Sequence, residues 1–483
     1  MQRSRNVSER GRQASPRASA TRSGVRTRPA PQTRRPSSAA KNVKNVKNVN
    51  ASRATAQRSA ADPRAEARMR ASVGSSAAVK SRKAPKDPSD RLKRKKKKEK
   101  DPNRIRFFSF EGRVDIPMLI ITLVLLAIGI TMMFSASPAY SYIDNQGDSY
   151  GYVTRQMTAA VIGLAGMTLL TLFDYRFLRF ESKRLHITAS HIFLVICIIM
   201  NAMCYFVGIE AVGGQKRWLQ IPIMGQFQPS DFLKVALIIF MAYYIHRHSD
   251  KMRMFKYGIL KPLLIMIPVA ASVVVQKHLS CLLIIFMIFA VLLFVGGVNM
   301  KQAVPLAVGF VLIVYFVVSV VQVGYFQQRI EYMDPLSDPG DQSYQNFQSA
   351  LAIGSGGIWG KGFGNSSQKY NYLPEAQNDF VFAILVEEFG LVGGVFVIVL
   401  FIIFIMRGLY VARKAEDKFG CLMATGITFQ IGVQALLNIA VNLCCIPNTG
   451  VSLPFFSYGG TALVLQLWEM GLLLSISKRA RVN

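Results

Sequence analysis

Two candidate catalytic acids and two bases lie within one polar, Gly-rich segment that interrupts an otherwise apolar chain. Residues 344–388 hold the acids Glu375 and Asp379 and the bases Lys361 and Lys369. Asp379 directly precedes a new apolar run, so we expect it at the boundary between membrane and water. A carboxylate there, with cations nearby, suits general-base chemistry on a charged substrate whose other end lies in lipid.

A second polar segment and a helix start could also meet a charged ligand. Residues 213–228 contain Lys216, Arg217 and Trp218, and Ser457 stands in the sequence PFFSYGGT before the last apolar run. Arginine binds phosphate through a bidentate fork, whereas the tryptophan is equally typical of a lipid interface. Ser457 predicts either a helix cap with tight packing or a phosphate site at a helix N-terminus.

Several charged residues fall inside apolar runs. Asp231 and Lys234 are three residues apart and share one helix face. They form either a structural ion pair or part of a cavity wall. Glu387 and Glu388 point about 100° apart on a helix, so at most one faces a given cavity. Glu469 stands alone, and the sequence assigns it no role.

These residues must be positioned by membrane-spanning helices. Apolar runs of ~20 residues recur along the chain, the length needed to cross the hydrocarbon core. We predict spans at about 115–136, 156–174, 187–208, 229–246, 260–276, 279–297, 303–323, 380–406, 420–441 and 459–477. Helices satisfy their own backbone in lipid. The predicted fold class is therefore an all-α polytopic membrane protein with about ten transmembrane helices and a long extracytoplasmic loop between helices 7 and 8.

Charge divides the chain into two parts. The 483 residues are 51% hydrophobic yet carry a net charge of +31, and most of that excess lies in residues 1–113. Their composition predicts a disordered basic cytoplasmic tail, followed by the membrane domain at 114–483. The run KRKKKKEK at 93–100 is either a patch attracted to anionic membrane lipids or a solvated tail. No fold or aromatic pattern typical of nucleic-acid binding accompanies it.

Loop charges predict the orientation. Lys and Arg are frequent in the loops at 174–187, 246–261 and 406–419 and at the C-terminus, whereas 442–458 has none. The positive-inside rule then places both termini in the cytoplasm and the loop at 324–379 outside. The N-terminus lacks the apolar stretch of a cleaved signal peptide, so we expect the first span to direct insertion.

The sequence predicts no metal centre and no ATP site. Its six cysteines and five histidines lack the spacing of metal ligands, and it contains no Walker-type phosphate loop. ATP is absent outside the cell, so an external reaction needs a substrate that was activated beforehand.

Three stretches carry a resemblance. GGQKRWLQIPIMGQFQPSDFLK, YQNFQSALAIGSGGIWGKGFGNSSQKYNYLPEAQNDFVFAILVEEFGLVGG and GVSLPFFSYGGTAL resemble the SEDS family (shape, elongation, division and sporulation), whose members include FtsW, RodA and SpoVE. The resemblance covers roughly residues 115–480, and the wording of the long loop is nearer to the FtsW/SpoVE branch. It implies a peptidoglycan glycosyltransferase that polymerises lipid II on the outer face of the bacterial cytoplasmic membrane, in division or sporulation. It also implies a partner, a class B penicillin-binding protein with transpeptidase activity.

The resemblance implies roles for particular residues. The family's key aspartate corresponds to Asp379, which would act as the general base in an inverting transfer, with Glu375 as the rival base. The candidates for substrate binding are Lys216, Arg217, Lys361, Lys369, Gln377 and Ser457. The sequence neither requires nor excludes a divalent cation, Mg²⁺ or Mn²⁺, beside the pyrophosphate.

Two departures from the family pattern stand out. The family usually has Glu where this chain has Asp231. It also usually has Pro-Asp followed by Leu-Gly-Thr where this chain reads Gln276, Lys277, His278, Leu279 and Ser280. A carboxylate is lost and an imidazole is gained, so no role transfers to that loop, and the pattern also fits a specialised paralogue.

Three further functions fit parts of the sequence. A lipid II flippase has similar composition, but its decisive charges should lie near the membrane midplane. Here the richest polar segment is a predicted external loop, which favours an enzyme. An elongation-type, RodA-like polymerase is the second of these functions, and a scaffold that recruits proteins through the tail is the third.

Overall fold

The structure is a computed structural model that describes residues 107–108, 112–181, 188–211, 215–221, 225–276, 278–299 and 341–480, with a few positions between 301 and 308. Almost all of the predicted tail at 1–113 and of the predicted seventh span at 303–323 lies outside the described residues, and so does Lys277.

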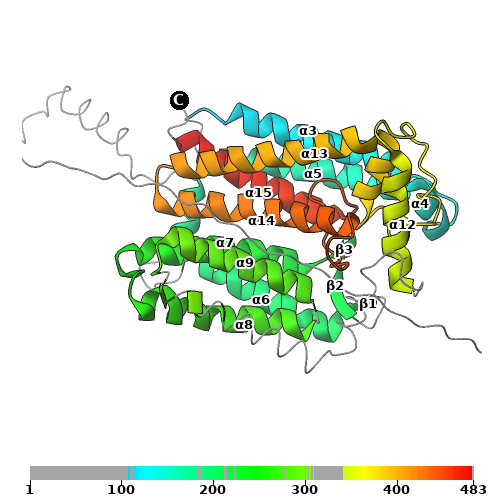
Figure 1. Cartoon of the computed structure of the whole chain (residues 1–483). Helices are drawn as coiled ribbons and strands as arrows, with labels where there is room; N and C mark the ends of the chain where they lie inside the picture. The colour runs from blue at the N-terminus through cyan, green and yellow to red at the C-terminus, as the bar shows by residue number, and fades with distance from the viewer. Residues whose placement is uncertain are drawn as a thin grey trace, which may run out of the picture. The chain divides into compact units, whose positions relative to one another are not determined.

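Long helices dominate the described part of the chain (Figure 1). They are α3 (Ile116–Ala136), α5 (Gly151–Leu172), α6 (Ala189–Val207), α7 (Pro229–Arg247), α8 (Lys261–Val275), α9 (Leu279–Gly296), α13 (Val381–Lys414), α14 (Lys418–Asn442) and α15 (Gly460–Arg479). Among the described residues, eight helices are long and apolar enough to cross a membrane, with one π-helical turn, Lys256–Leu260, counted with α8. The fold class predicted from the sequence, an all-α polytopic membrane protein, is confirmed.

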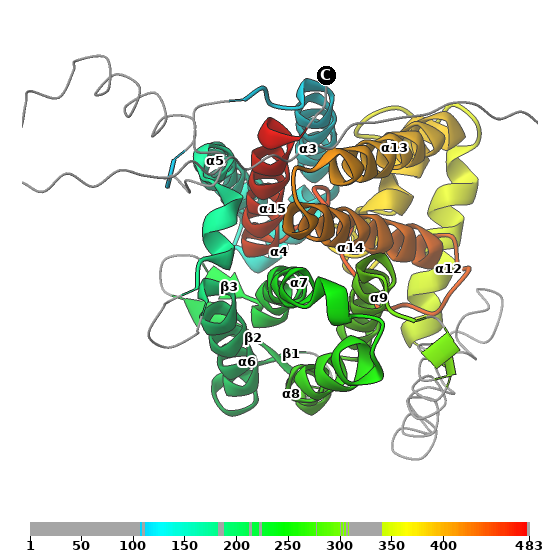
Figure 2. The same cartoon turned by 90° about the vertical axis from the view of Figure 1, so that its left-hand side faces the viewer.

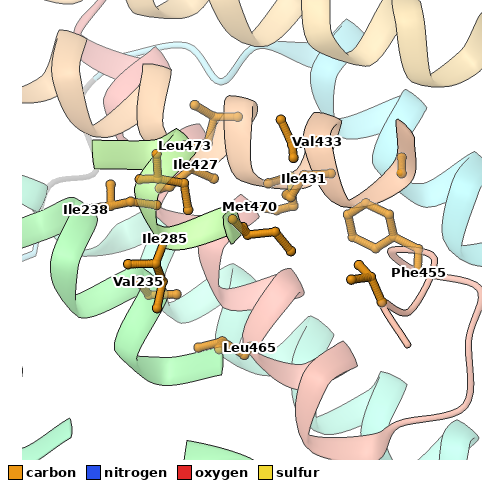
Figure 3. Packing of buried hydrophobic residues seen from close by; sticks show 14 of the residues in the cluster. Val235, Ile238, Ile285, Ile427, Ile431, Val433, Phe455, Leu465, Met470 and Leu473 are labelled. Atoms are coloured by element: carbon orange, nitrogen blue, oxygen red, sulfur yellow. The ribbon is translucent and has the colours of Figure 1, made fainter. Parts of the chain in front are cut away.

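Three helices form the centre of the bundle. Figure 2 looks along the helices and shows α7, α14 and α15 surrounded by the others. Apolar side chains of these three helices pack together with Ile285 of α9 (Figure 3); they include Val235, Ile238, Ile427, Ile431, Val433, Leu465, Met470 and Leu473. At Gly426 of α14 the backbone approaches α7 so closely that a Cβ atom would lie 2.6 Å from Ile238 Cγ2. Small residues permit such contacts between membrane helices, where packing replaces the hydrophobic effect.

Ion pairs join the helix ends at one side of the bundle, which we call the basic end. Arg479, at the end of α15, contacts Asp174 at 2.9 Å. Asp174 caps the short 3₁₀ helix η1 (Tyr175–Arg179). Arg407 of α13 contacts Asp115, the residue that caps α3, at 2.8 Å. The basic loops predicted from the sequence thus share one end of the bundle.

The opposite end carries most of the irregular structure, and we call it the sheet end. A small antiparallel sheet has the order β1 (Ile209–Ala211), β2 (Gln215–Ile221) and β3 (Gly225–Phe227). Next to it lie the short helix α4 (Pro138–Asp144) and the turns at 357–379. These turns lead directly into α13, so the fold delivers Asp379 to this end.

One feature of the long predicted loop, and one of the helix that follows it, differ from expectation. Residues Asp341–Gly356 form a helix, α12, where the polar composition predicted no regular structure. Its Ser349 Oγ donates to the main-chain carbonyl of Asn442 at 2.9 Å, so packing against α14 stabilises it. In addition, α13 is bent at Gly390, whose φ of 70° lies in the left-handed region.

Candidate active site

Asp379 lies at the junction between the turns and α13. Its side chain is half-buried. Its main-chain carbonyl accepts hydrogen bonds from Asn438 Nδ2 at 2.8 Å and Asn442 Nδ2 at 2.9 Å. The loop at 443–459 passes beside the carboxylate, since a Cβ on Gly450 would lie 3.7 Å from Asp379 Oδ2. The carboxylate is thus held against a second loop.

The rival acid occupies a different environment. Glu375 is exposed and has a left-handed backbone with a φ of 54°. Its carboxylate accepts from Asn378 Nδ2 at 2.5 Å, and its carbonyl accepts from the main-chain N–H of Asp379 at 3.1 Å. Glu375 therefore closes the turn that precedes the helix.

The two loop lysines form ion pairs with the start of α13. Lys361 Nζ contacts Glu387 Oε1 at 2.6 Å, and Lys369 Nζ contacts Glu388 Oε1 at 3.1 Å. The adjacent glutamates each take a separate partner, as their angular separation requires. These ion pairs neutralise Lys361 and Lys369, the two lysines that are predicted from the sequence to bind pyrophosphate.

Lys369 is the more deeply held of the two lysines, with only 6% of its surface exposed. Its ammonium group also donates to Ser135 Oγ of α3 at 3.0 Å and to the Gly364 carbonyl at 2.6 Å. These contacts indicate that Lys369 holds the loop in place and does not face a ligand.

Asp231 and Lys234 combine the two roles that the sequence left open. Their charged groups lie 2.8 Å apart at the start of α7. They also line a small polar pocket between α7, α14 and α15, with Gln430, Gln434, Ser452, Gln466 and Glu469. Glu469, to which sequence analysis assigns no role, accepts a hydrogen bond from Gln430 Nε2 at 2.7 Å. The glutamines of this pocket escaped prediction because single amides in apolar runs resemble ordinary helix residues.

The basic pair Lys216 and Arg217 lies on β2, and both side chains are half-buried. Arg217 Nε donates to the Gln276 carbonyl at 3.5 Å, which links the sheet to the loop between α8 and α9. His278 in that loop is buried. Burial lowers the pKa of His278 well below its usual value, and the charges of Arg217 and Lys234 lower it further. The imidazole that replaces the expected acid is therefore neutral.

Gln377 contacts the main chain of Tyr458, the residue that follows Ser457. The carbonyl of the buried Gln377 accepts from the N–H of Tyr458 at 2.8 Å. Ser457 Oγ accepts from the N–H of Leu453 at 2.8 Å, so it closes the turn before α15. The prediction that Ser457 caps the helix is wrong, because Gly459 holds the cap position and its neighbours supply no side-chain cap.

The described residues include no group of three or more His, Cys, Asp or Glu side chains that could hold a metal ion. Mg²⁺ and Mn²⁺ prefer oxygen ligands and tolerate a shell completed by substrate phosphates. A divalent cation beside the pyrophosphate would therefore have to be held largely by the phosphate oxygens of the substrate and by water.

Comparison with known proteins gives a consistent result. The family model of the FtsW, RodA and SpoVE proteins, described as "Cell cycle protein", matches residues 116–482. A Geobacter sulfurreducens protein named "Probable peptidoglycan glycosyltransferase FtsW" is 33% identical over 372 residues, which cover 76% of this chain and 96% of that protein. "Stage V sporulation protein E" of Bacillus subtilis is 35% identical over 369 residues, which cover 76% and 98%.

Solved structures show the same fold. A structure described as "Structural coordination of polymerization and crosslinking by a peptidoglycan synthase complex" matches with a TM-score of 0.62 at 24% identity, covering 77% of this chain and 99% of the other. The rod shape determining protein RodA of Thermus thermophilus matches with a TM-score of 0.54 at 23% identity, covering 77% and 98%.

Proposed function

The chain belongs to the FtsW/RodA/SpoVE family of cell cycle proteins and is a multi-pass membrane peptidoglycan glycosyltransferase, and from that membership and the site geometry we propose that it polymerises lipid II with Asp379 as the general base. The observation that carries this proposal is the half-buried carboxylate of Asp379 at the sheet end, held at its main chain by two amides.

The proposed reaction is a direct displacement. Asp379 takes the proton from a sugar hydroxyl of the acceptor, and the hydroxyl oxygen attacks the anomeric carbon of the donor. A carbon–oxygen bond forms there while the bond to the polyprenyl pyrophosphate breaks, and the bonding electrons leave with the pyrophosphate. Attack from the opposite side inverts the anomeric carbon. Pyrophosphate is already a good leaving group, so a second carboxylate is not needed to protonate it.

The departing pyrophosphate needs cations. Lys361 and Lys369 already neutralise Glu387 and Glu388. We propose that Lys216 and Arg217 of β2 serve the pyrophosphate, because a guanidinium binds phosphate through a bidentate fork and an ammonium binds it as a point charge. Gln377 and Ser457 act through their main-chain contacts, shaping the wall on the other side.

We propose that the sheet end faces the outside of the cell. The basic end carries Arg179, Arg407 and Arg479, and positive loops stay in the cytoplasm. Both termini would then be cytoplasmic, as the sequence predicts. The substrate would approach Asp379 from the outer leaflet.

The test is polymerisation of lipid II by the purified full-length chain in detergent. We expect Asp379→Asn to lose about 100-fold or more in rate, and Glu375→Gln to keep most of it. Full activity of Asp379→Asn would remove the proposed base. Glycan formed in detergent, without a sealed membrane, separates this proposal from the lipid II flippase.

A partner belongs to the same proposal. One similar structure is described as a complex that coordinates polymerization and crosslinking. We propose that a class B penicillin-binding protein crosslinks the strands that this chain makes. Rates measured with and without such a protein, and with and without Mg²⁺ or Mn²⁺, test both dependences. If only a class B penicillin-binding protein of cell elongation raises the polymerisation rate, an elongation-type role is indicated instead.

A further inference from the structure

Two asparagines of α14 meet the main chain of Asp379. Asn438 and Asn442 lie one turn apart, and both are buried, with 1% and 0% of their surfaces exposed. Each Nδ2 group donates to the same acceptor, the carbonyl oxygen of Asp379, at 2.8 and 2.9 Å. A carbonyl oxygen has two lone pairs, so the two amides saturate it.

The other end of the Asn442 amide reaches the next turn. Its Oδ1 accepts from the main-chain N–H of Ala383 at 3.0 Å. In a regular helix that N–H would donate to the carbonyl four residues earlier, which is the carbonyl of Asp379. The carboxamide of Asn442 thus stands between two groups that would otherwise bond to each other.

The start of α13 follows from this bridge. The N–H of Ala383 also donates to the carbonyl of Phe380 at 3.0 Å, which makes a tighter turn. The helix begins at Val381, and Phe380 at the cap position has no side-chain cap. Asn442 therefore caps α13 from a neighbouring helix and keeps Asp379 outside the helical turn.

The same two residues fix the loop opposite the carboxylate. Asn438 Nδ2 also donates to the carbonyl of Val451 at 2.8 Å. Val451 follows Gly450, whose backbone passes beside the Asp379 carboxylate. Both walls around the carboxylate are thereby fixed to one turn of α14.

We propose that Asn442 and Asn438 are positioning residues that hold the Asp379 carboxylate in its reactive place by keeping its backbone out of α13. This inference rests on the proposed function of Asp379. Without the bridge, the Ala383 N–H and the Asp379 carbonyl can pair directly. The helix would then extend backwards by one turn and rotate the carboxylate away from the loop at 443–459.

The experiment compares the steady-state kinetics of full-length variants with lipid II. We expect Asn442→Ala to lower kcat by about 100-fold, the effect of a displacement of about 1 Å in a reacting group. KM should change less than about threefold, because the variant removes no group from the proposed pyrophosphate site. Asn438→Ala should lower kcat less, because Asn442 still holds the carbonyl.

Ser349→Ala is the matched control. It removes a buried hydrogen bond to the carbonyl of Asn442 and touches neither Asp379 nor Ala383. Its Tm should fall about as far as that of Asn442→Ala while its kcat stays near the wild-type value. Equal kcat losses in both variants would show that lost stability explains the effect, and would overturn the inference.

Asn442→Asp keeps the side-chain size and removes the donor, so it tests the inference if the alanine variant fails to fold. We expect it to lower kcat, but less than Asn442→Ala, because its carboxylate still accepts from the Ala383 N–H while it can no longer donate to the Asp379 carbonyl. A normal kcat would overturn the positioning role. In an Asp379→Asn background, Asn442→Ala should cause no further loss. If Asp379→Asn is inactive and both Asn442 variants are normal, the positioning role alone fails. If Asp379→Asn is fully active, the proposed base fails first.

Discussion

The turns between α12 and α13 are held in two different ways. Residues 357–369 are fastened by charge, through the pairs of Lys361 with Glu387 and of Lys369 with Glu388. Breaking a buried pair by removing one partner leaves an uncompensated charge, which costs about 3–5 kcal/mol. This half of the loop is therefore fixed by its most polar residues.

Residues 370–379 are held by neutral groups. Tyr140 of α4 donates its hydroxyl to the carbonyl of Leu373 at 2.8 Å, and the amides of Asn438 and Asn442 hold the carbonyl of Asp379. Neutral donors fix a backbone without adding a charge beside the carboxylate. The charged lysines of the loop thus fasten residues 357–369, whereas neutral amides hold the main chain of the proposed base.

Glu388→Gln should have the largest effect, and it tests whether an ion pair holds residues 357–369. It leaves the Lys369 ammonium buried without its carboxylate, so we expect the free energy of unfolding to fall by about 3–5 kcal/mol. Thermal unfolding of the purified protein in detergent measures the change as a lower Tm. The double variant Lys369→Met with Glu388→Gln should recover much of the loss, because neither charge remains. A double variant as unstable as the single one would contradict the charge-fastening role.

The kink of α13 offers the next largest effect. At Gly390 a Cβ would lie 2.3 Å from the Ile358 carbonyl oxygen, and the backbone is left-handed. Gly390→Ala should therefore cost about 1–3 kcal/mol and loosen residues 357–369 first. Gly354→Ala is the control, since nothing lies within 4 Å of its position. Equal Tm values for the two variants would show that the kink does not fasten the loop.

The sequence predicted the bounds of several described helices closely, because the thickness of the bilayer sets the length of a span. The prediction at 420–441 became α14, Lys418–Asn442, and that at 459–477 became α15, Gly460–Arg479. The helix α12 was missed because its polar residues are stabilised by packing, as Ser349 is against Asn442. The pattern of polar and apolar residues within one segment does not reveal a contact with a segment 93 residues away.

The site was only partly predictable for a similar reason. Asp379 could be predicted because it stands between a Gly-rich polar segment and an apolar run, and because the resemblance assigns the family's key aspartate to this position. The partners of Lys361 and Lys369 lie 26 and 19 residues away, so their ion pairs depend on the path of the loop. Asn438 and Asn442 gave no signal, since an asparagine within an apolar run is equally typical of a residue packed inside a bundle.

Lys361→Met should have a smaller effect than Glu388→Gln. Lys361 is 31% exposed, so its pair is partly screened. Glu387 also keeps other donors, the hydroxyl of Ser366 at 2.5 Å and the N–H of Ser367 at 3.0 Å. We expect a loss of about 1.5 kcal/mol, the lower end of the range for a hydrogen bond to a charged group, again measured by Tm. A loss as large as that of Glu388→Gln would mean that both lysines fasten the loop equally.

The smallest effect concerns a base that is held neutral. Burial keeps the pKa of His278 well below its usual value of 6.5. Below that pH the unfolded chain binds a proton that the folded chain does not, so stability falls as the pH falls. Between pH 7.5 and pH 5.5 this one group should cost about 1 kcal/mol. His278→Gln removes this titrating group, so the Tm of the variant should decline less than the wild-type Tm over the same pH range. An unchanged pH dependence in His278→Gln would mean that the folded protein also protonates this histidine, and that the loop between α8 and α9 carries charge near the proposed pyrophosphate site.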